Sequence, residues 1–184
     1  MKSPLKTILI PALLTIAAFL SLMYVSCNRD QCKTVVCANN GVCNQGSCTC
    51  PSGYGGTNCQ TVLRDKFEGV WQVFEKGSTT NAAQYGITIS AGANITDLVI
   101  TKLFNYFGPV NAQVAGVNGD SLIIPAQQIQ GKLVFGTGYI YSTATYGQFA
   151  SISMSYEVID TATDMIDDFG YYGPDLSAPS SWNK

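Results

Sequence analysis

From residue 63 onward, apolar residues come in short β-branched and aromatic runs that are separated by Gly, Asn, Asp and Ser. This spacing is typical of an antiparallel all-β meander, and the region lacks a helical period. The clearest alternation runs from Ala150 to Val158, where every second residue is apolar and Glu157 and three serines lie between. We expect the apolar set to face a core and the polar set to face water. The pattern predicts eight strands, at residues 67–75, 84–90, 98–104, 110–117, 121–125, 132–141, 149–159 and, more weakly, 165–171.

Eight antiparallel strands are enough to close an up-and-down β-barrel, which would occupy residues 62–172. Asn118-Gly119 lies between two apolar runs and predicts a type I′ hairpin, so the fourth and fifth strands should be antiparallel neighbours. The tail at 173–184 contains Pro174, Pro179 and several serines, and we expect it to be flexible.

A bore of eight strands is just wide enough to be filled by its own side chains or to hold one small ligand. The sequence favours a filled bore without a continuous apolar cavity, although Ala112, Gly116 and Ala150 are also assigned inward. The aromatic residues assigned inward are Trp71, Tyr85, Phe104, Phe135, Tyr139 and Tyr156.

The first residues have the pattern of a targeting segment. Lys2 and Lys6 precede an uncharged apolar run that extends to residue 28, and the run ends in Val25-Ser26-Cys27. This arrangement resembles a bacterial lipoprotein signal peptide, which implies removal of residues 1–26, a lipid on Cys27 and a short linker at 27–31. The alternative is an uncleaved transmembrane helix. In both cases the rest of the chain lies outside the cytoplasm.

Six cysteines lie between residues 32 and 59 in the spacing C-x4-C-x5-C-x4-C-x-C-x8-C. The segment is too short for a hydrophobic core, so covalent bridges must hold it. A zinc site is the rival interpretation, but such sites usually include His and the chain has none.

This spacing, with Gly53, Tyr54 and Gly56 before the last cysteine, resembles an epidermal growth factor (EGF)-like module at 32–60. The resemblance implies that Cys32 pairs with Cys43, Cys37 with Cys48 and Cys50 with Cys59. Cys27 is left over, which agrees with its lipidation. Asp30 and Asn44 would make a poor calcium site, so we expect no tight calcium binding.

The segment FEGVW, with Gly69 and Trp71, resembles the G-x-W element that opens the first strand of lipocalins and related calycin barrels. In that family the Trp plugs one barrel end beneath a basic side chain of the last strand; the predicted last strands here have no Arg or Lys before Lys184. The later order, ITDLVITKLFNYFG, SLIIPAQQI, GTGYIY and SISMSYEVID, resembles small lipocalin-like domains of bacterial envelope lipoproteins.

Candidate chemistry is sparse. The chain has no histidine, and its formal net charge of −2 becomes −4 if Lys2 and Lys6 are removed, which excludes a basic nucleic-acid binder. Carboxylates would have to supply acid–base catalysis, and we expect the one cluster available to be a solvated loop rather than a glycosidase-like pair. That cluster consists of Asp160, Asp164, Asp167 and Asp168.

A set of late tyrosines could form a sugar-stacking platform if they were exposed, but alternating strand aromatics usually pack inward, so we expect most of them in the core. These are Tyr139, Tyr141, Tyr146, Tyr171 and Tyr172. Ser121 and Thr161 each follow an Asp in tripeptides that resemble bacterial O-glycosylation acceptors, which makes them candidate glycosylation sites.

These features together predict a lipid-anchored protein of the bacterial cell envelope that acts by binding rather than catalysis and requires no cofactor. An interaction or adhesion module that binds a protein or a glycan is the first hypothesis, because an EGF-like spacer followed by a neutral β domain suits display away from a membrane. The alternative is a lipocalin-like carrier of a small apolar ligand. An enzyme is the third, because the sequence offers no nucleophile, base and orienting group that could act together.

Overall fold

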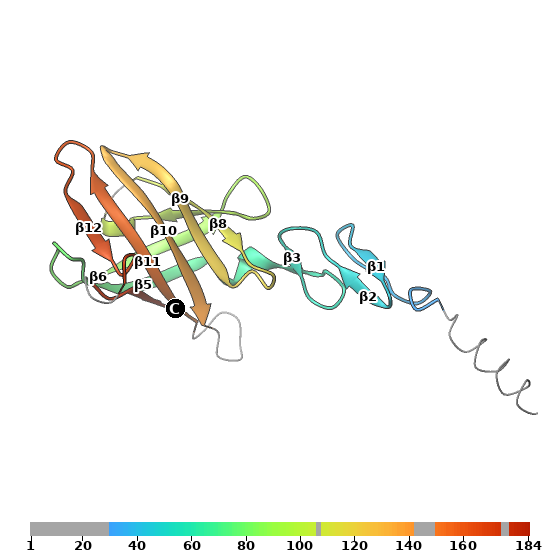
Figure 1. Ribbon diagram of the computed structural model, residues 1–184. Coiled ribbons are helices and arrows are strands. Elements are labelled where there is room, and N and C mark those ends of the chain that lie inside the picture. Colours follow the sequence, from blue (N-terminus) through green and yellow to red (C-terminus); the bar gives the residue numbers. More distant parts are fainter. Residues whose placement is uncertain (1–29, 106–107, 142–149, 174–176) are drawn as a thin grey trace, which may run out of the picture.

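The computed structural model describes residues 30–105, 108–141, 150–173 and 177–184. A narrow N-terminal module extends from one end of a larger β-barrel (Figure 1). The predicted signal peptide, Cys27 and Tyr146 lie outside the described residues. Within the described ranges, no helix is long and apolar enough to cross a membrane.

The N-terminal module contains two small antiparallel hairpins. β1 (Val42–Asn44) pairs with β2 (Ser47–Thr49), and β3 (Tyr54–Gly55) pairs with β4 (Thr61–Val62). The 3₁₀ turn η1 (Leu63–Lys66) follows β4 directly and leads into the barrel. The module therefore joins the barrel through a short connection.

The barrel is an antiparallel ring of eight strands in the order β5-β6-β7-β8-β9-β10-β11-β13, and it closes where β13 pairs with β5. All strands of the predicted meander are present, and the all-β class and the closed barrel are confirmed. Their bounds are β5 (Gly69–Glu75), β6 (Ala83–Ala91), β7 (Asp97–Thr101), β8 (Val110–Ala115), β9 (Ser121–Ile129), β10 (Lys132–Tyr141), β11 (Ser151–Asp160), β12 (Ile166–Phe169) and β13 (Ser180–Asn183), with the 3₁₀ turn η2 (Leu103–Asn105) after β7.

The strand that closes the ring was not predicted. β12, the expected eighth strand, pairs only with the Tyr156–Ile159 end of β11, whereas β13 pairs with the Ser151–Met154 end and continues to β5. The prediction of a flexible tail at 173–184 is therefore wrong, and the barrel extends beyond residue 172. The physical reason is Trp182, which is 0% exposed and anchors a four-residue strand within a stretch rich in Pro and Ser.

The predicted burial pattern of β11 is confirmed for the inward residues and wrong for one outward residue, Glu157. Ala150, Ile152, Met154, Tyr156 and Val158 are all buried. Glu157 points outward as expected but is 0% exposed, because it lies between Phe135 of β10 and Asp168 of β12. The short strand β12 thus covers an outer position that the sequence pattern assigned to water.

The orientation of β10 is the reverse of the prediction. Phe135 and Tyr139 point outward, and the inward positions include Gly136 and Gly138. These glycines lie opposite Tyr156 and Met154, and a Cβ atom on either glycine would collide with its large partner. The interior has room for the bulky Tyr156 and Met154 of β11 because the residues of β10 opposite them are glycines, which have no side chains.

The hairpin between β8 and β9 is antiparallel, as predicted, but its turn is not type I′. The Gly119 amide donates to the Gly116 carbonyl, so Val117 and Asn118 occupy the two central positions. Only the flanking Gly116 and Gly119 have positive φ, 86° and 63°. Gly116 is therefore an exposed turn residue rather than an inward one.

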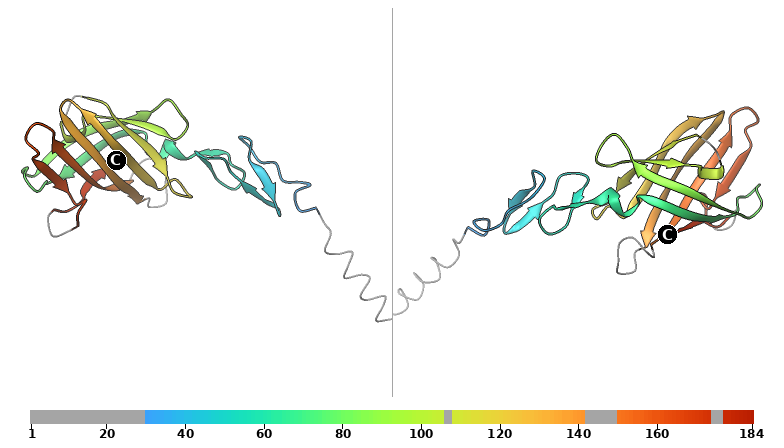
Figure 2. Two further views of the ribbon diagram at one scale, coloured as in Figure 1. Left: turned by 45° about the horizontal axis from the view of Figure 1, so that its top comes forward. Right: turned by 180° about the vertical axis from the view of Figure 1, so that it is seen from behind.

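The strands enclose the interior of the barrel, as the two views of Figure 2 show. One cluster of buried apolar side chains occupies this interior. Of the aromatic residues assigned inward, Trp71 and Tyr156 are fully buried, and Tyr85 and Phe104 pack against the core. The core also contains Phe67, Phe169 and Trp182, which the prediction did not include.

Candidate functional site

The barrel end nearest the EGF-like module is plugged by Trp71. Its Nε1 donates to the Phe67 carbonyl oxygen at 2.7 Å, and the Lys184 Nζ atom lies 5.1 Å from the centroid of its ring. Burial lowers the pKa of Lys184, and Glu68 opposes the shift. Lys184 is the residue directly after β13, so a basic side chain at the end of the closing strand lies over the Trp71 ring.

The opposite end of the bore contains a buried carboxylate that the sequence analysis did not identify. Glu75 Oε1 accepts a hydrogen bond from the Tyr85 hydroxyl at 2.5 Å, and Oε2 accepts from the hydroxyls of Tyr156 and Ser180 at 2.7 and 2.8 Å. The Trp182 Nε1 donates to Ser180 Oγ at 2.8 Å. A single charged group therefore links β5, β6, β11 and the closing strand.

Glu75 accepts hydrogen bonds from residues of other strands and so has a structural role. Desolvation raises its pKa, while the hydrogen bonds from Tyr85, Tyr156 and Ser180 oppose the shift. Desolvation and the nearby Glu75 charge also raise the pKa of Tyr156. All three donors point at the carboxylate, so its hydrogen-bonding capacity is used to hold strands together.

A small apolar hollow lies near this end of the bore, among the residues that the structure describes. This apolar hollow between η2 and strands β8 to β11, lined by residues such as Phe104, Val110 and Val158, measures about 10 Å³. That volume is about the minimum for a single water molecule and far below that of a small apolar ligand.

The four carboxylates of the predicted cluster lie in different surroundings. Asp160 forms an ion pair with Lys132 at 3.1 Å and also accepts hydrogen bonds from the turn that follows it. Asp164 is exposed in that turn. Asp167 and Asp168 are consecutive in β12 and therefore point to opposite faces of the strand.

The expectation of a solvated loop is wrong for Asp167 and Asp168, because both are buried. Asp167 Oδ1 accepts from the amides of Thr79 and Thr80, at 2.8 and 3.4 Å, and so fastens the β5–β6 loop. Asp168 accepts from Ser177 Oγ at 2.6 Å and from backbone amides of the segment that leads to β13. The two carboxylates therefore shape loops.

Glu157 is the buried carboxylate that lacks such donors. Neither of its oxygens makes a hydrogen bond of normal geometry with a described residue. Burial raises its pKa, the Asp168 carboxylate adds to the shift, and the Tyr172 hydroxyl opposes it.

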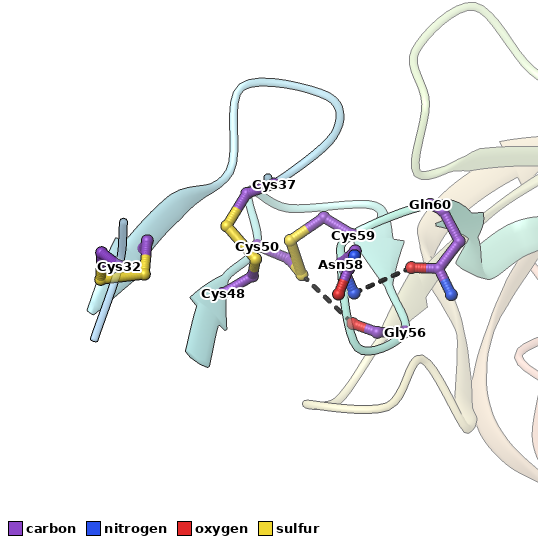
Figure 3. The surroundings of a disulfide bond; sticks show 9 residues. Cys32, Cys37, Cys48, Cys50, Gly56, Asn58, Cys59 and Gln60 are labelled. Atoms are coloured by element: carbon purple, nitrogen blue, oxygen red, sulfur yellow. Dashed lines mark hydrogen bonds between the residues drawn. A yellow bond between two sulfur atoms is a disulfide. The ribbon is translucent and has the colours of Figure 1, made fainter. Parts of the chain in front are cut away.

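The N-terminal module contains the three disulfide bonds that the EGF resemblance implied: Cys32–Cys43, Cys37–Cys48 and Cys50–Cys59 (Figure 3). The Asn58 amide donates to Gln60 Oε1 at 2.9 Å beside the last bridge. Asp30 Oδ1 accepts from the Cys32 amide at 3.0 Å. This carboxylate, considered above as a calcium ligand, thus orders the start of the module.

The module contacts the barrel beyond the chain connection. Arg64 Nη1 donates to the carbonyl of Asn94 at 2.7 Å, and Ile95 lies against Gly53. Lys66 Nζ donates to the Asn118 carbonyl at 2.8 Å and forms an ion pair with Asp120. Gly53 of the module thus lies against the β6–β7 loop, while η1 is bonded to that loop through Arg64 and to the β8–β9 hairpin through Lys66.

The outer surface of β10 and β11 displays the tyrosines that were expected in the core. Tyr139 and Tyr141 are 54% and 61% exposed, and Tyr171 and Tyr172 are also exposed, so that expectation is wrong for the described members. We call the outward residues of this region the tyrosine–serine face: Thr137, Tyr139, Tyr141, Ser151, Ser153 and Ser155. In the β10–β11 register, Tyr139 lies opposite Ser153, Tyr141 opposite Ser151 and Thr137 opposite Ser155.

The two candidate glycosylation residues lie at strand ends. Ser121 begins β9 and is half-buried, and Thr161 is exposed after β11, where its hydroxyl donates to the Gly131 carbonyl at 2.7 Å. The Asp residues before them, Asp120 and Asp160, each pair with a lysine.

Sequence reasoning missed Glu75, Ser180 and Glu157. Glu75 could have been suspected, because it ends the apolar alternation of Trp71 and Val73 on the inward face of β5. Ser180 gave no signal, because it belongs to the strand mistaken for a tail. Glu157 is buried only through the approach of β12, which local sequence does not reveal.

Comparison with known proteins identifies the first domain. Residues 34–61 match the family described as Teneurin-like EGF domain. No curated protein matches the chain. A crystal structure of a protein of unknown function from Bacteroides ovatus is 10% identical, with a TM-score of 0.40 over 71% of this chain and 52% of that one. The chain thus spans about half the length of that protein, and it contains an EGF-like region similar to the Teneurin-like family.

Proposed function

We propose that this chain is a non-catalytic binding protein of the bacterial cell envelope, anchored by a lipid on Cys27, and that it binds its partner with the outer surface of the barrel. Three disulfides require an oxidising compartment, which supports a location outside the cytoplasm. The combination of an EGF-like region and a β-barrel supports a binding or interaction role there. In this proposal the module is a spacer that holds the barrel away from the membrane.

The observation that carries the proposal is the packing of the bore. Trp71 plugs one end beneath Lys184, and the Glu75 network occupies the other. The apolar hollow among the described residues measures about 10 Å³, far less than an apolar ligand of ordinary size occupies. The placement of Lys184 across Trp71 supports the likeness to lipocalin barrels, but a bore packed in this way favours surface binding over the carrier function of that family.

Titration of the full chain with a panel of apolar fluorescent probes tests the proposal. We expect no stoichiometric binding by the wild type. Trp71→Ala should create a cavity that such probes can enter, and it should destabilise the chain by about 3–5 kcal/mol, so the variant is the positive control. Stoichiometric probe binding by the wild type at low micromolar concentration would instead identify an apolar ligand carrier.

A further inference from the structure

The tyrosine–serine face contains two aromatic rings that are largely open to solvent. Tyr139 and Tyr141 are more than half exposed, although the inward residue between them, Ile140, is buried. Residues two apart in a strand lie about 6.8 Å apart on one face, so the two rings form adjacent steps along β10. Phe135 on the same outer side is different, because the Tyr171 ring packs edge-on against it at 5.0 Å.

A hydroxyl accompanies each exposed ring. Ser153 lies directly opposite Tyr139 and Ser151 directly opposite Tyr141, and opposed residues have Cβ atoms about 4.5–5.5 Å apart. Each serine hydroxyl can donate one hydrogen bond and accept two. Among the described residues, neither these serines nor Ser155 uses its hydroxyl for an internal hydrogen bond. The face therefore places aromatic rings on β10 beside serine hydroxyls on β11.

The absence of charged residues on the tyrosine–serine face favours an uncharged ligand. None of the six residues of the face is charged. Asp120 adjoins Ile140 at the edge of the face, but its carboxylate is paired with Lys66, and the Lys132–Asp160 pair lies at the other end of β10 and β11. The carboxylates that border the face beyond Thr137 and Ser155 are Glu157 and Asp168, which lie opposite one another. Both carboxylates are buried and so are not accessible to a ligand, but their negative charge at this border disfavours an anionic partner.

We infer that the tyrosine–serine face binds a neutral glycan, with Tyr139 and Tyr141 stacked against sugar rings and Ser151 and Ser153 bonded to their hydroxyls. A pyranose ring presents an apolar C–H surface and a rim of hydroxyls, which matches this pattern of rings and hydroxyls. Tyrosine suits the role because it supplies a large amphipathic surface with few rotatable bonds. This inference rests on the proposed function, since it names the ligand class for the outer surface.

Native affinity electrophoresis of the full chain in a nonionic detergent tests the inference. The gels would contain soluble neutral polysaccharides, namely an α-glucan, a β-glucan, a mannan, a xylan and a galactan, or the anionic polygalacturonate. We expect at least one neutral polysaccharide to retard the wild type and polygalacturonate to leave its migration unchanged. Tyr139→Ala and Tyr141→Ala should each weaken the retardation at least tenfold.

Two matched variants separate stacking from folding. Phe74→Ala removes another exposed aromatic residue, on the outer side of β5, and should bind like the wild type. Tyr139→Phe keeps the ring and should retain most of the binding, and thermal melts should show that the tyrosine variants remain folded.

Retardation by none of the neutral polysaccharides would overturn the glycan inference, as would equal retardation of wild type and Tyr139→Ala. So would a concentration-dependent dimer that Tyr139→Ala abolishes, because a second copy of the chain would then occupy the face. The proposed function would survive these results and would fail only if apolar probes entered the wild-type bore.

Discussion

Replacing Trp182 by Ala is the most direct test of how the barrel closes. Trp182 is 0% exposed and lies between Val73 of β5 and Ile152 of β11 in the strand register. If the tail at 173–184 were a flexible appendage, this substitution would have little effect. Because β13 is the eighth strand of the ring, we expect a large loss of stability.

The magnitude follows from the buried area. A buried Trp side chain loses roughly 170 Å² beyond its Cβ, which at about 25 cal/mol per Å² corresponds to about 4 kcal/mol. This agrees with the usual 3–5 kcal/mol for Trp→Ala in a core. The Ser180 oxygen also loses the donor Trp182 Nε1 but keeps its own donation to Glu75. Since a small domain has only about 5–15 kcal/mol of stability, the barrel should become marginal.

Urea unfolding of the oxidised full chain, followed by the fluorescence of Trp71, measures this loss. Trp182→Phe should cost less, because it keeps a buried aromatic ring and removes only part of the indole together with its Nε1 donor. Asn183→Ala is the matched control in the same strand: its side chain is exposed, so stability should change by less than about 0.5 kcal/mol. A free energy of unfolding for Trp182→Ala within about 1 kcal/mol of the wild type would refute the closing role of β13.

Four further predictions concern other sites. Gly136→Ala should destabilise by about 1–3 kcal/mol in the same urea assay because a Cβ there collides with the backbone of Tyr156, whereas Gly86→Ala, with nothing within 4 Å, should be nearly neutral. Glu157→Gln should raise the melting temperature at pH 7 but not at pH 4: the folded pKa of Glu157 lies above the ordinary 4.5, so wild-type stability falls as the pH rises through the folded pKa. An equal advantage at both pH values would contradict this. Mass spectrometry of the mature protein should find a lipid on Cys27 and the other cysteines oxidised, and an unmodified Cys27 thiol would favour the membrane-helix alternative. Calorimetry should detect no calcium binding tighter than millimolar, and saturation at micromolar calcium would disprove that prediction.

The sequence determined those features that depend on local pattern. The cysteine count and spacing predicted a disulfide-held module, and its resemblance to EGF-like modules implied the three bridges that the structure contains. The β-branched runs predicted the meander, and the serines between the apolar residues of β11 marked which side faces the core, because side chains alternate strictly along a strand.

The tertiary structure decided whatever depends on contacts between distant segments. In the sequence, the face of β10 that contains Phe135 and Tyr139 is the more apolar one and was assigned to the core. The structure reverses this assignment, because the bulky Tyr156 and Met154 of β11 lie opposite Gly136 and Gly138. The closing strand was hidden because four residues gain their stability from β5 and β11 rather than from their own propensity. The exposed Tyr139 and Tyr141, and with them the proposed binding face, follow from that same choice of face, which packing between strands makes and local sequence does not.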